Sequence, residues 1–173
     1  MTMPTRLRFR DAGEGDVAAI AGLQNAAAGA LTARFGAGPW SFLTTERAAE
    51  LSLRHARVRV GLLGRRVVTV LRLAAKKPWA IDVSYFTPVA RPLYLTGMAV
   101  SVEHQGQGLG RLALEDAREV AIAHPADAIR LDAYDADAGA SEFYARCGFA
   151  ERGDVVYKGT PLVYHELLLG VSS

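Results

Sequence analysis

Three glycines lie within residues 105–110, which read Gln-Gly-Gln-Gly-Leu-Gly. Glycine lets the backbone turn tightly and leaves no side chain in the way, so such a turn can direct several amide N–H groups at one point. If the turn opens a helix, the positive end of that helix adds to the attraction for an anion. The segment therefore predicts a site for a phosphorylated small molecule.

The runs on either side of the turn have the patterns of a buried strand and of a helix. Residues 93–102 are uncharged and rich in Leu, Val, Met and Tyr, which is typical of a buried strand. Residues 109–123 repeat apolar side chains at helical spacing, and His124-Pro125 follows them. The glycine turn is thus expected to connect a strand to the beginning of a helix.

The spacing of the glycines separates the known kinds of phosphate loop. A nucleotide-hydrolysing loop places Lys and then Ser or Thr directly after its last glycine, whereas Arg111-Leu112 stand here, so this class is excluded. A nicotinamide-dinucleotide site remains open because Asp132 falls near the position of a ribose-binding acid. However, that site normally opens a series of βαβ units, and only about one unit follows here. A glycine turn without any ligand also remains open.

Two motifs resemble those of the GNAT family of N-acetyltransferases. Gln105, Gly108 and Gly110 match the family's acyl-CoA motif Arg/Gln-x-x-Gly-x-Gly/Ala. A second signature follows the next predicted strand, and the chain matches it at Asp137, Ala140, Phe143, Tyr144, Gly148 and Phe149. The resemblance covers residues 93–149, with one departure: Asp137 stands where the family usually has Asn.

The resemblance implies an enzyme that moves an acetyl group from acetyl-CoA to a primary amine by direct attack in a ternary complex. It implies no metal, and an acceptor that is a small molecule or a peptide. The residues expected to bind the donor are Met98, Ala99, Val100, Gln105, Gly106, Gln107, Gly108, Leu109, Gly110, Arg111, Asp137, Ala140 and Tyr144. A regulatory module that binds acyl-CoA without turnover stays open as an alternative.

The resemblance also assigns catalytic roles. Tyr144 is expected to protonate the departing thiolate, unless it is an aromatic residue of the core. Asp132 is the candidate general base, because related ribosomal-protein acetyltransferases have a catalytic Glu at that place; the alternative is a solvated strand residue or one in a salt bridge with Arg130. Deprotonation of the amine through water, with no dedicated base, also stays open. Other candidate bases are Glu103, His104, Asp82, Tyr85 and Glu166. Candidates for lining the acceptor site are Trp40, Phe42, Trp79, Tyr85 and Phe86.

Composition limits the class of protein. A chain of 173 residues with 50% hydrophobic content predicts a single N-acetyltransferase domain over residues 1–173. No apolar run is long enough for a bilayer, no secretory signal is visible in residues 1–6, and the single Cys147 agrees with a reducing compartment, so we expect a cytoplasmic protein. Residues 1–77 contain 13 Lys and Arg, but these are scattered, so nucleic acid is not an expected partner.

The order of expected elements is β-α-α-β-β-β-α-β-α-β-β, which the resemblance places in the α/β (α+β) class. It implies a mixed, mostly antiparallel sheet of about seven strands with helices on both faces. The expected strands cover residues 7–10, 58–63, 67–73, 93–102, 129–134, 155–157 and 162–168, and the expected helices cover 14–29, 44–55, 109–123 and 140–147. The apolar terminal strand has little sequence after it to cover its edge, which predicts a homodimer.

Overall fold

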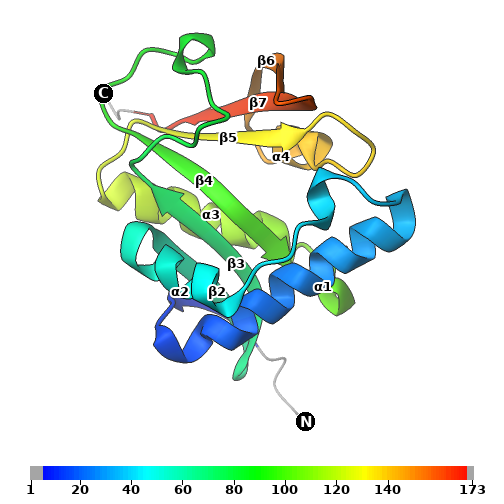
Figure 1. The fold of residues 1–173 in the computed structure, drawn as a ribbon. Helices are drawn as coiled ribbons and strands as arrows, with labels where there is room; N and C mark the ends of the chain where they lie inside the picture. The colour runs from blue at the N-terminus through cyan, green and yellow to red at the C-terminus, as the bar shows by residue number, and fades with distance from the viewer. Residues whose placement is uncertain (1–5, 171–173) are drawn as a thin grey trace. The chain divides into compact units, whose positions relative to one another are not determined.

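The computed structural model describes residues 6–170 (Figure 1). Residues 1–5, which are part of the segment assessed for a secretory signal, lie outside the described residues. The strands are β1 (Leu7–Asp11), β2 (Arg57–Leu63), β3 (Arg66–Ala74), β4 (Pro92–Val100), β5 (Ala128–Tyr134), β6 (Ala150–Tyr157) and β7 (Thr160–Leu168). The helices are α1 (Val17–Phe35), α2 (Glu46–His55), α3 (Leu109–Ala123) and α4 (Ser141–Arg146), with short 3-10 turns η1 (Glu14–Asp16), η2 (Pro39–Ser41), η3 (Val83–Tyr85) and η4 (Val102–His104).

The seven strands pair in the order β1-β2-β3-β4-β5-β7-β6. β4 and β5 pair in parallel, whereas β1 with β2, β5 with β7 and β6 with β7 are antiparallel. The expected mixed, mostly antiparallel sheet is therefore confirmed. The expectation that β7 has an uncovered edge is wrong, because β7 pairs with β5 on one side and with β6 on the other.

Most element boundaries differ from those predicted by one or two residues, and those of α1 and β6 differ more; β6 begins at Ala150 instead of residue 155. α1 continues to Phe35 instead of ending near residue 29, because Gly29 keeps the helical conformation and the helix ends only at Gly36, whose φ is 83°. β4 ends at Val100 rather than at residue 102, since the backbone turns at Ser101, whose carbonyl accepts a hydrogen bond from the His104 N–H at 2.9 Å.

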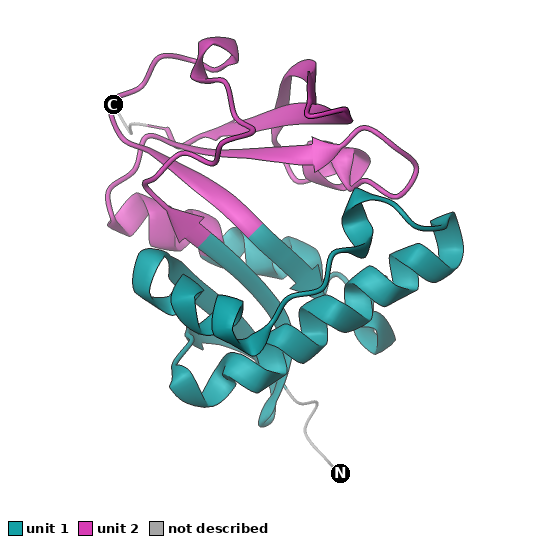
Figure 2. Ribbon diagram, viewed as in Figure 1, with its two compact units in different colours: residues 1–72, 97–116 teal, residues 73–96, 117–173 magenta. Residues whose placement is uncertain are grey.

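The chain forms two compact units, Met1–Arg72 with Gly97–Asp116, and Leu73–Thr96 with Ala117–Ser173 (Figure 2). β3, β4 and α3 each contribute residues to both units. A single domain over residues 1–173 stays a prediction.

In the first unit, helices cover both faces of the strands. One face packs against α1 and α2 in a core of Ile20, Leu23, Ala49, Val58, Val60, Leu62, Val70 and Ala99. Because side chains alternate along a strand, Arg59 lies on the opposite face of β2 from Val58 and Val60. There its guanidinium forms two hydrogen bonds, of 2.9 and 2.8 Å, with Asp116 of α3.

The second unit ties a long irregular connection to β5 and β7. Tyr164 of β7 accepts a hydrogen bond from the Asp82 N–H at 3.1 Å and donates one to the Ala80 carbonyl. The Arg130 guanidinium pairs with the Glu166 carboxylate at 3.1 Å and donates to the Thr87 carbonyl at 2.6 Å. These contacts fix residues 80–87 against β7 and against β5, which carries Asp132.

Within the described residues, each helix falls short of the length and apolar character needed to cross a bilayer.

Candidate active site

The glycine turn lies between η4 and α3, in the first unit. Gly106 has a φ of 78° and Gly108 a φ of 81°, in the left-handed region that side chains other than glycine rarely adopt. A Cβ built on either residue would meet no atom within 4 Å. Glycine is thus needed for the backbone conformation, while the space beside the turn is open.

The turn leads directly into α3. The Leu112 N–H donates to the Gly108 carbonyl at 3.2 Å, so Gly108 begins the helical hydrogen bonding. The amides of the first turn have no acceptor within the helix and point out of its N-terminus. Gln105 holds the other side of the turn to the strand end, since its side-chain amide donates to the Val100 carbonyl at 3.3 Å. This arrangement suits a phosphate group.

The end of β4 that precedes the turn has a kink. Gly97 has a φ of 63°, and its carbonyl accepts a hydrogen bond from the Gln24 side chain of α1 at 2.9 Å. Of the next three residues, Met98 and Val100 are half-buried and Ala99 packs into the core. Ala99 can therefore contact a bound molecule only through its backbone.

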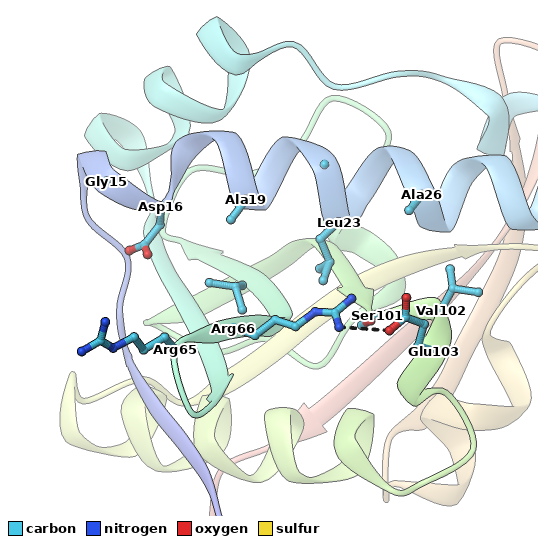
Figure 3. Close-up of a pocket in the computed structure, with 12 residues that line it drawn as sticks. Gly15, Asp16, Ala19, Leu23, Ala26, Arg65, Arg66, Ser101, Val102 and Glu103 are labelled. Carbon is cyan, nitrogen blue, oxygen red and sulfur yellow. Dashed lines mark ion pairs between the residues drawn. The ribbon is translucent and has the colours of Figure 1, made fainter. Parts of the chain in front are cut away.

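An open cleft of about 450 Å³ lies beside η4 in the same unit (Figure 3). Small residues of α1 form one wall, and the ion pair between Arg66 and Glu103, at 3.0 Å, forms another. Its lining residues are Gly15, Asp16, Ala19, Gly22, Leu23, Ala26, Arg65, Arg66, Val67, Ser101, Val102 and Glu103. The lining stops short of residues 105–110, so this cleft is separate from the glycine turn.

The second unit contains Tyr144, which is buried on α4. Its ring lies 5.3 Å from that of Phe143, 5.7 Å from that of Phe149 and 5.9 Å from that of His165, measured between centroids. Burial raises the pKa of the Tyr144 hydroxyl, and the charges of Asp132 and Cys147 raise it further. The phenol therefore keeps its proton at neutral pH, as a proton donor must.

Asp132 of β5 lies near three tyrosines. Its negative charge raises the pKa values of Tyr134, Tyr144 and Tyr164. Burial raises the pKa of the Asp132 carboxyl itself, which makes its carboxylate a stronger base than that of an exposed Asp. The alternative salt bridge with Arg130 is not formed, because Arg130 pairs with Glu166.

Two other candidate bases of the second unit, Asp82 and Glu166, are already engaged. The Asp82 carboxylate accepts hydrogen bonds from the Ser84 N–H at 3.0 Å and from its hydroxyl at 2.7 Å, which lower the pKa of Asp82. Glu166 is buried in its pair with Arg130. The Tyr85 ring packs edge-on against Tyr164, with centroids 5.5 Å apart.

Near the glycine turn, Glu103 is paired with Arg66 at 3.0 Å and His104 is held by Ser101. The His104 Nδ1 lies 3.1 Å from the Ser101 hydroxyl. The role of Asp132 as the base stays a prediction.

Sequence reasoning missed the pair formed by Ser141 and His165. The Ser141 hydroxyl oxygen lies 2.6 Å from His165 Nε2, while His165 Nδ1 is buried without a hydrogen-bond partner among the described residues. Burial lowers the pKa of His165, which keeps the imidazole neutral at neutral pH. The two residues are far apart in sequence, and a His within an apolar strand gave no signal of a polar partner.

The loop between β5 and α4 contains two predicted donor-binding residues. Asp137 and Ala140 are exposed, and Gly139 packs so closely on the Tyr134 carbonyl that a Cβ there would clash. The loop thus holds a tight conformation that leaves both residues accessible, and their contact with a donor stays a prediction.

The aromatic residues proposed for the acceptor differ in burial. Phe86 is 4% exposed and lies under the Arg130 guanidinium, 5.0 Å from it, so its assignment to the acceptor site is wrong. Phe42 and Trp79 are 84% and 86% exposed, and the Trp40 indole N–H donates to the Gly36 carbonyl at 2.9 Å. For these residues and for Tyr85, an acceptor role stays a prediction.

Residues 6–170 contain no group of His, Cys, Asp and Glu side chains suited to a metal ion.

Comparisons with known proteins agree with this architecture. The profile of the Acetyltransferase (GNAT) family matches residues 75–149, a range that includes both motifs. None of the curated protein sequences compared with the chain matches it.

Solved structures of acetyltransferases have the same fold. A ribosomal-protein-alanine N-acetyltransferase from Brucella melitensis has a TM-score of 0.72 at 18% identity, covering 94% of this chain and 99% of that one. YncA from Salmonella typhimurium, solved with its cofactor acetyl-CoA, has a TM-score of 0.70 at 20% identity, covering 97% and 96%. A spermidine N-acetyltransferase SpeG chimera from Vibrio cholerae has a TM-score of 0.68 at 20% identity, covering 94% and 95%.

The GNAT acetyltransferase profile thus matches residues 75–149, and the fold is that of solved acetyltransferases. This match and the shared fold support an acyl-CoA-dependent N-acetyltransferase as the general class. The antiparallel β6 and β7 do not fit the nicotinamide alternative, which requires a continuing series of parallel βαβ units.

Proposed function

We propose that the protein transfers an acetyl group from acetyl-CoA to a primary amine by direct attack in a ternary complex. The observation that carries the proposal is the combination of a protonated, buried Tyr144 with the carboxylate of Asp132, whose pKa is raised. A proton donor and a base near each other are what aminolysis of a thioester requires.

The donor is bound by the first unit's glycine turn and strand end. The open space beside Gly106 and Gly108 accepts the pyrophosphate, which the amides at the start of α3 stabilise. The backbone of Met98, Ala99 and Val100 bonds the pantetheine arm. Gln105, Gly106, Gln107, Gly108, Leu109, Gly110, Arg111, Asp137 and Ala140 complete the donor site.

The reaction forms a C–N bond and breaks the C–S bond of the thioester. Asp132 accepts the proton that the acceptor's ammonium group must lose before its nitrogen can attack the carbonyl carbon. Tyr144 donates its proton to the thiolate as it leaves and is reprotonated through solvent by the proton that the attacking nitrogen releases, so the products are an amide and free CoA.

The test is release of free thiol from acetyl-CoA in the presence of a panel of amines, combined with calorimetry of CoA binding. We expect binding, and thiol release with at least one amine. Binding without release for every amine would favour the non-catalytic acyl-CoA-binding module. Absence of CoA binding would refute the assignment of the glycine turn.

We also propose a homodimer, but through β6 instead of β7. β6 ends the strand order, and Val156 on it is 71% exposed. Edge strands of this kind tend to be paired or covered. Light scattering should give a mass near twice 18.5 kDa, and a mass near 18.5 kDa itself would refute the dimer.

A further inference from the structure

Arg72 of β3 is a half-buried arginine without a counter-charge among residues 6–170. Its Nη1 donates to the Ser52 hydroxyl of α2 at 2.6 Å, and this neutral group is its hydrogen-bond partner. Its Nε is buried and makes no hydrogen bond within the described part of the chain. Burial lowers the pKa of Arg72, with no carboxylate acting in the opposite direction.

The surroundings of Arg72 hold its guanidinium in place. A Cβ on Gly97 would lie 2.7 Å from Nε and 3.0 Å from Nη2, so the guanidinium packs flat on the glycine backbone, where a larger residue would not fit. Gln24 fixes the Gly97 carbonyl, and Ser52 fixes the guanidinium. The charge is therefore positioned by three elements, α1, α2 and β4, before any ligand binds.

A positioned, partly desolvated charge without a partner costs stability, and such groups are typical of sites that bind a ligand of opposite charge. Arg130, which is fully buried, shows which acceptors a structural arginine has in this fold. It donates to the Glu166 carboxylate, the Tyr94 hydroxyl and the Thr87 carbonyl. Arg72, in contrast, has a single acceptor, the Ser52 hydroxyl. Planar guanidinium groups bind carboxylates through paired hydrogen bonds, which are stronger than those to neutral groups.

We propose that Arg72 binds a carboxylate of the acceptor, and that the acceptor is an amine that also carries a carboxylate, as amino acids do. The proposal rests on the proposed function and names the substrate class for it. The position supports it, since Gly97 directly precedes the β4 residues assigned to the pantetheine arm.

The experiment compares acceptors that differ only in the carboxylate. Each amino acid of a panel is assayed beside its carboxamide, with thiol release from acetyl-CoA as the readout. The carboxamide has the more easily deprotonated amine, so intrinsic reactivity favours it, and a preference for the acid must come from binding. We expect the wild-type protein to prefer the acids by at least about tenfold in kcat/KM.

Substitution of Arg72 should remove this preference. Arg72→Gln should lower kcat/KM for the acid by about 10- to 100-fold, mainly through KM, and leave the carboxamide nearly unchanged. Arg72→Lys keeps the charge without the planar fork and should lose part of the preference. Arg47→Gln, at an exposed position of α2, is the matched control and should behave as wild type.

Thermal stability separates ligand binding from a structural role. If Arg72 serves a ligand, Arg72→Gln removes an unpaired, desolvated charge, so its Tm should be equal to or higher than that of wild type. If Arg72 instead holds α2 through Ser52, the variant should melt lower and lose activity on acids and carboxamides alike. The second result would overturn the proposal.

Equilibrium binding tests the proposal without turnover. Calorimetry of the CoA-loaded protein should show that the acids bind more tightly than the matching carboxamides. Arg72→Gln should abolish this difference. Arg72-dependent binding of acids without any acetylation would refute the proposed function and support the carboxylate site. Equal use of acids and carboxamides, or no Arg72-dependent binding of any acid, would overturn the carboxylate site and leave the acetyltransferase in place.

Discussion

The role of Tyr144 can be tested by a substitution that removes only its hydroxyl oxygen. Tyr144→Phe keeps the aromatic ring and its contacts with Phe143, Phe149 and His165 but removes the hydroxyl that would protonate the thiolate. Because burial and the charge of Asp132 raise the pKa of this hydroxyl, its proton is present over the whole neutral range.

The expected magnitudes differ between rate and stability. General acid catalysis contributes about 10²–10⁴-fold, or roughly 3–5 kcal/mol, so kcat should fall within that range. The packing is retained, so the free energy of unfolding should change by less than about 1 kcal/mol, which corresponds to about 2–4 °C in Tm for a chain of this size. The affinity for acetyl-CoA should stay the same.

Tyr94→Phe is the matched control in the assay of thiol release and thermal melting. The buried Tyr94 hydroxyl accepts a hydrogen bond from Arg130 at 3.2 Å, so its loss leaves a buried donor without a partner. We expect this variant to lose about 1–3 kcal/mol of stability and to keep its turnover. A Tyr144→Phe enzyme with full kcat, or one that behaves like Tyr94→Phe, would refute the general-acid assignment.

Three further variants test the donor site, the base and the core. Gly108→Val should abolish CoA binding in calorimetry while the protein stays folded, since a φ of 81° costs a side chain about 1–2 kcal/mol and the branched group fills the open space. Folding raises the pKa of Asp132, so between its ordinary pKa and its folded-state pKa the native protein binds more protons than the unfolded chain. The free energy of unfolding therefore falls as pH rises through this window. Asp132→Asn should remove that fall in pH-dependent melts and also the rise of kcat with pH. Glu166→Gln should cost about 3–5 kcal/mol in denaturant unfolding, because it leaves Arg130 buried without its charge partner; a loss below 1 kcal/mol would contradict this account.

Local patterns predicted most of the elements because local chemistry decides them. α3 covers residues 109–123 as predicted, since the glycine turn and His124-Pro125 mark its two ends. Thr45 caps α2 through a hydrogen bond from the Ala48 N–H, as a Thr before a helix should. The place of β7 could not be predicted, because strand order depends on which distant strands pair and an apolar strand gives no signal of its neighbours.

The same distinction holds for the candidate site. The glycine turn and Tyr144 were recognisable because their spacing lies within one segment of chain. The engagement of Glu166 with Arg130, and of Ser141 with His165, joins residues from separate elements. Such partners become visible only when the strands are in register, and so the sequence alone could not show which of the candidate bases are already paired.

The buried and half-buried charged groups of this protein fall into two kinds, and the difference supports the assignments made above. Arg130 and Glu166 neutralise each other and satisfy several hydrogen bonds, so the fold itself accounts for both charges. Asp132 and Arg72 lose solvent without gaining an opposite charge, so each of them lowers the stability of the protein. A fold gains nothing from such groups, whereas a base and a carboxylate receptor must be unpaired before their substrates arrive. The gain in stability expected for Asp132→Asn and Arg72→Gln therefore measures how much stability the protein loses by keeping these two groups unpaired for an acceptor.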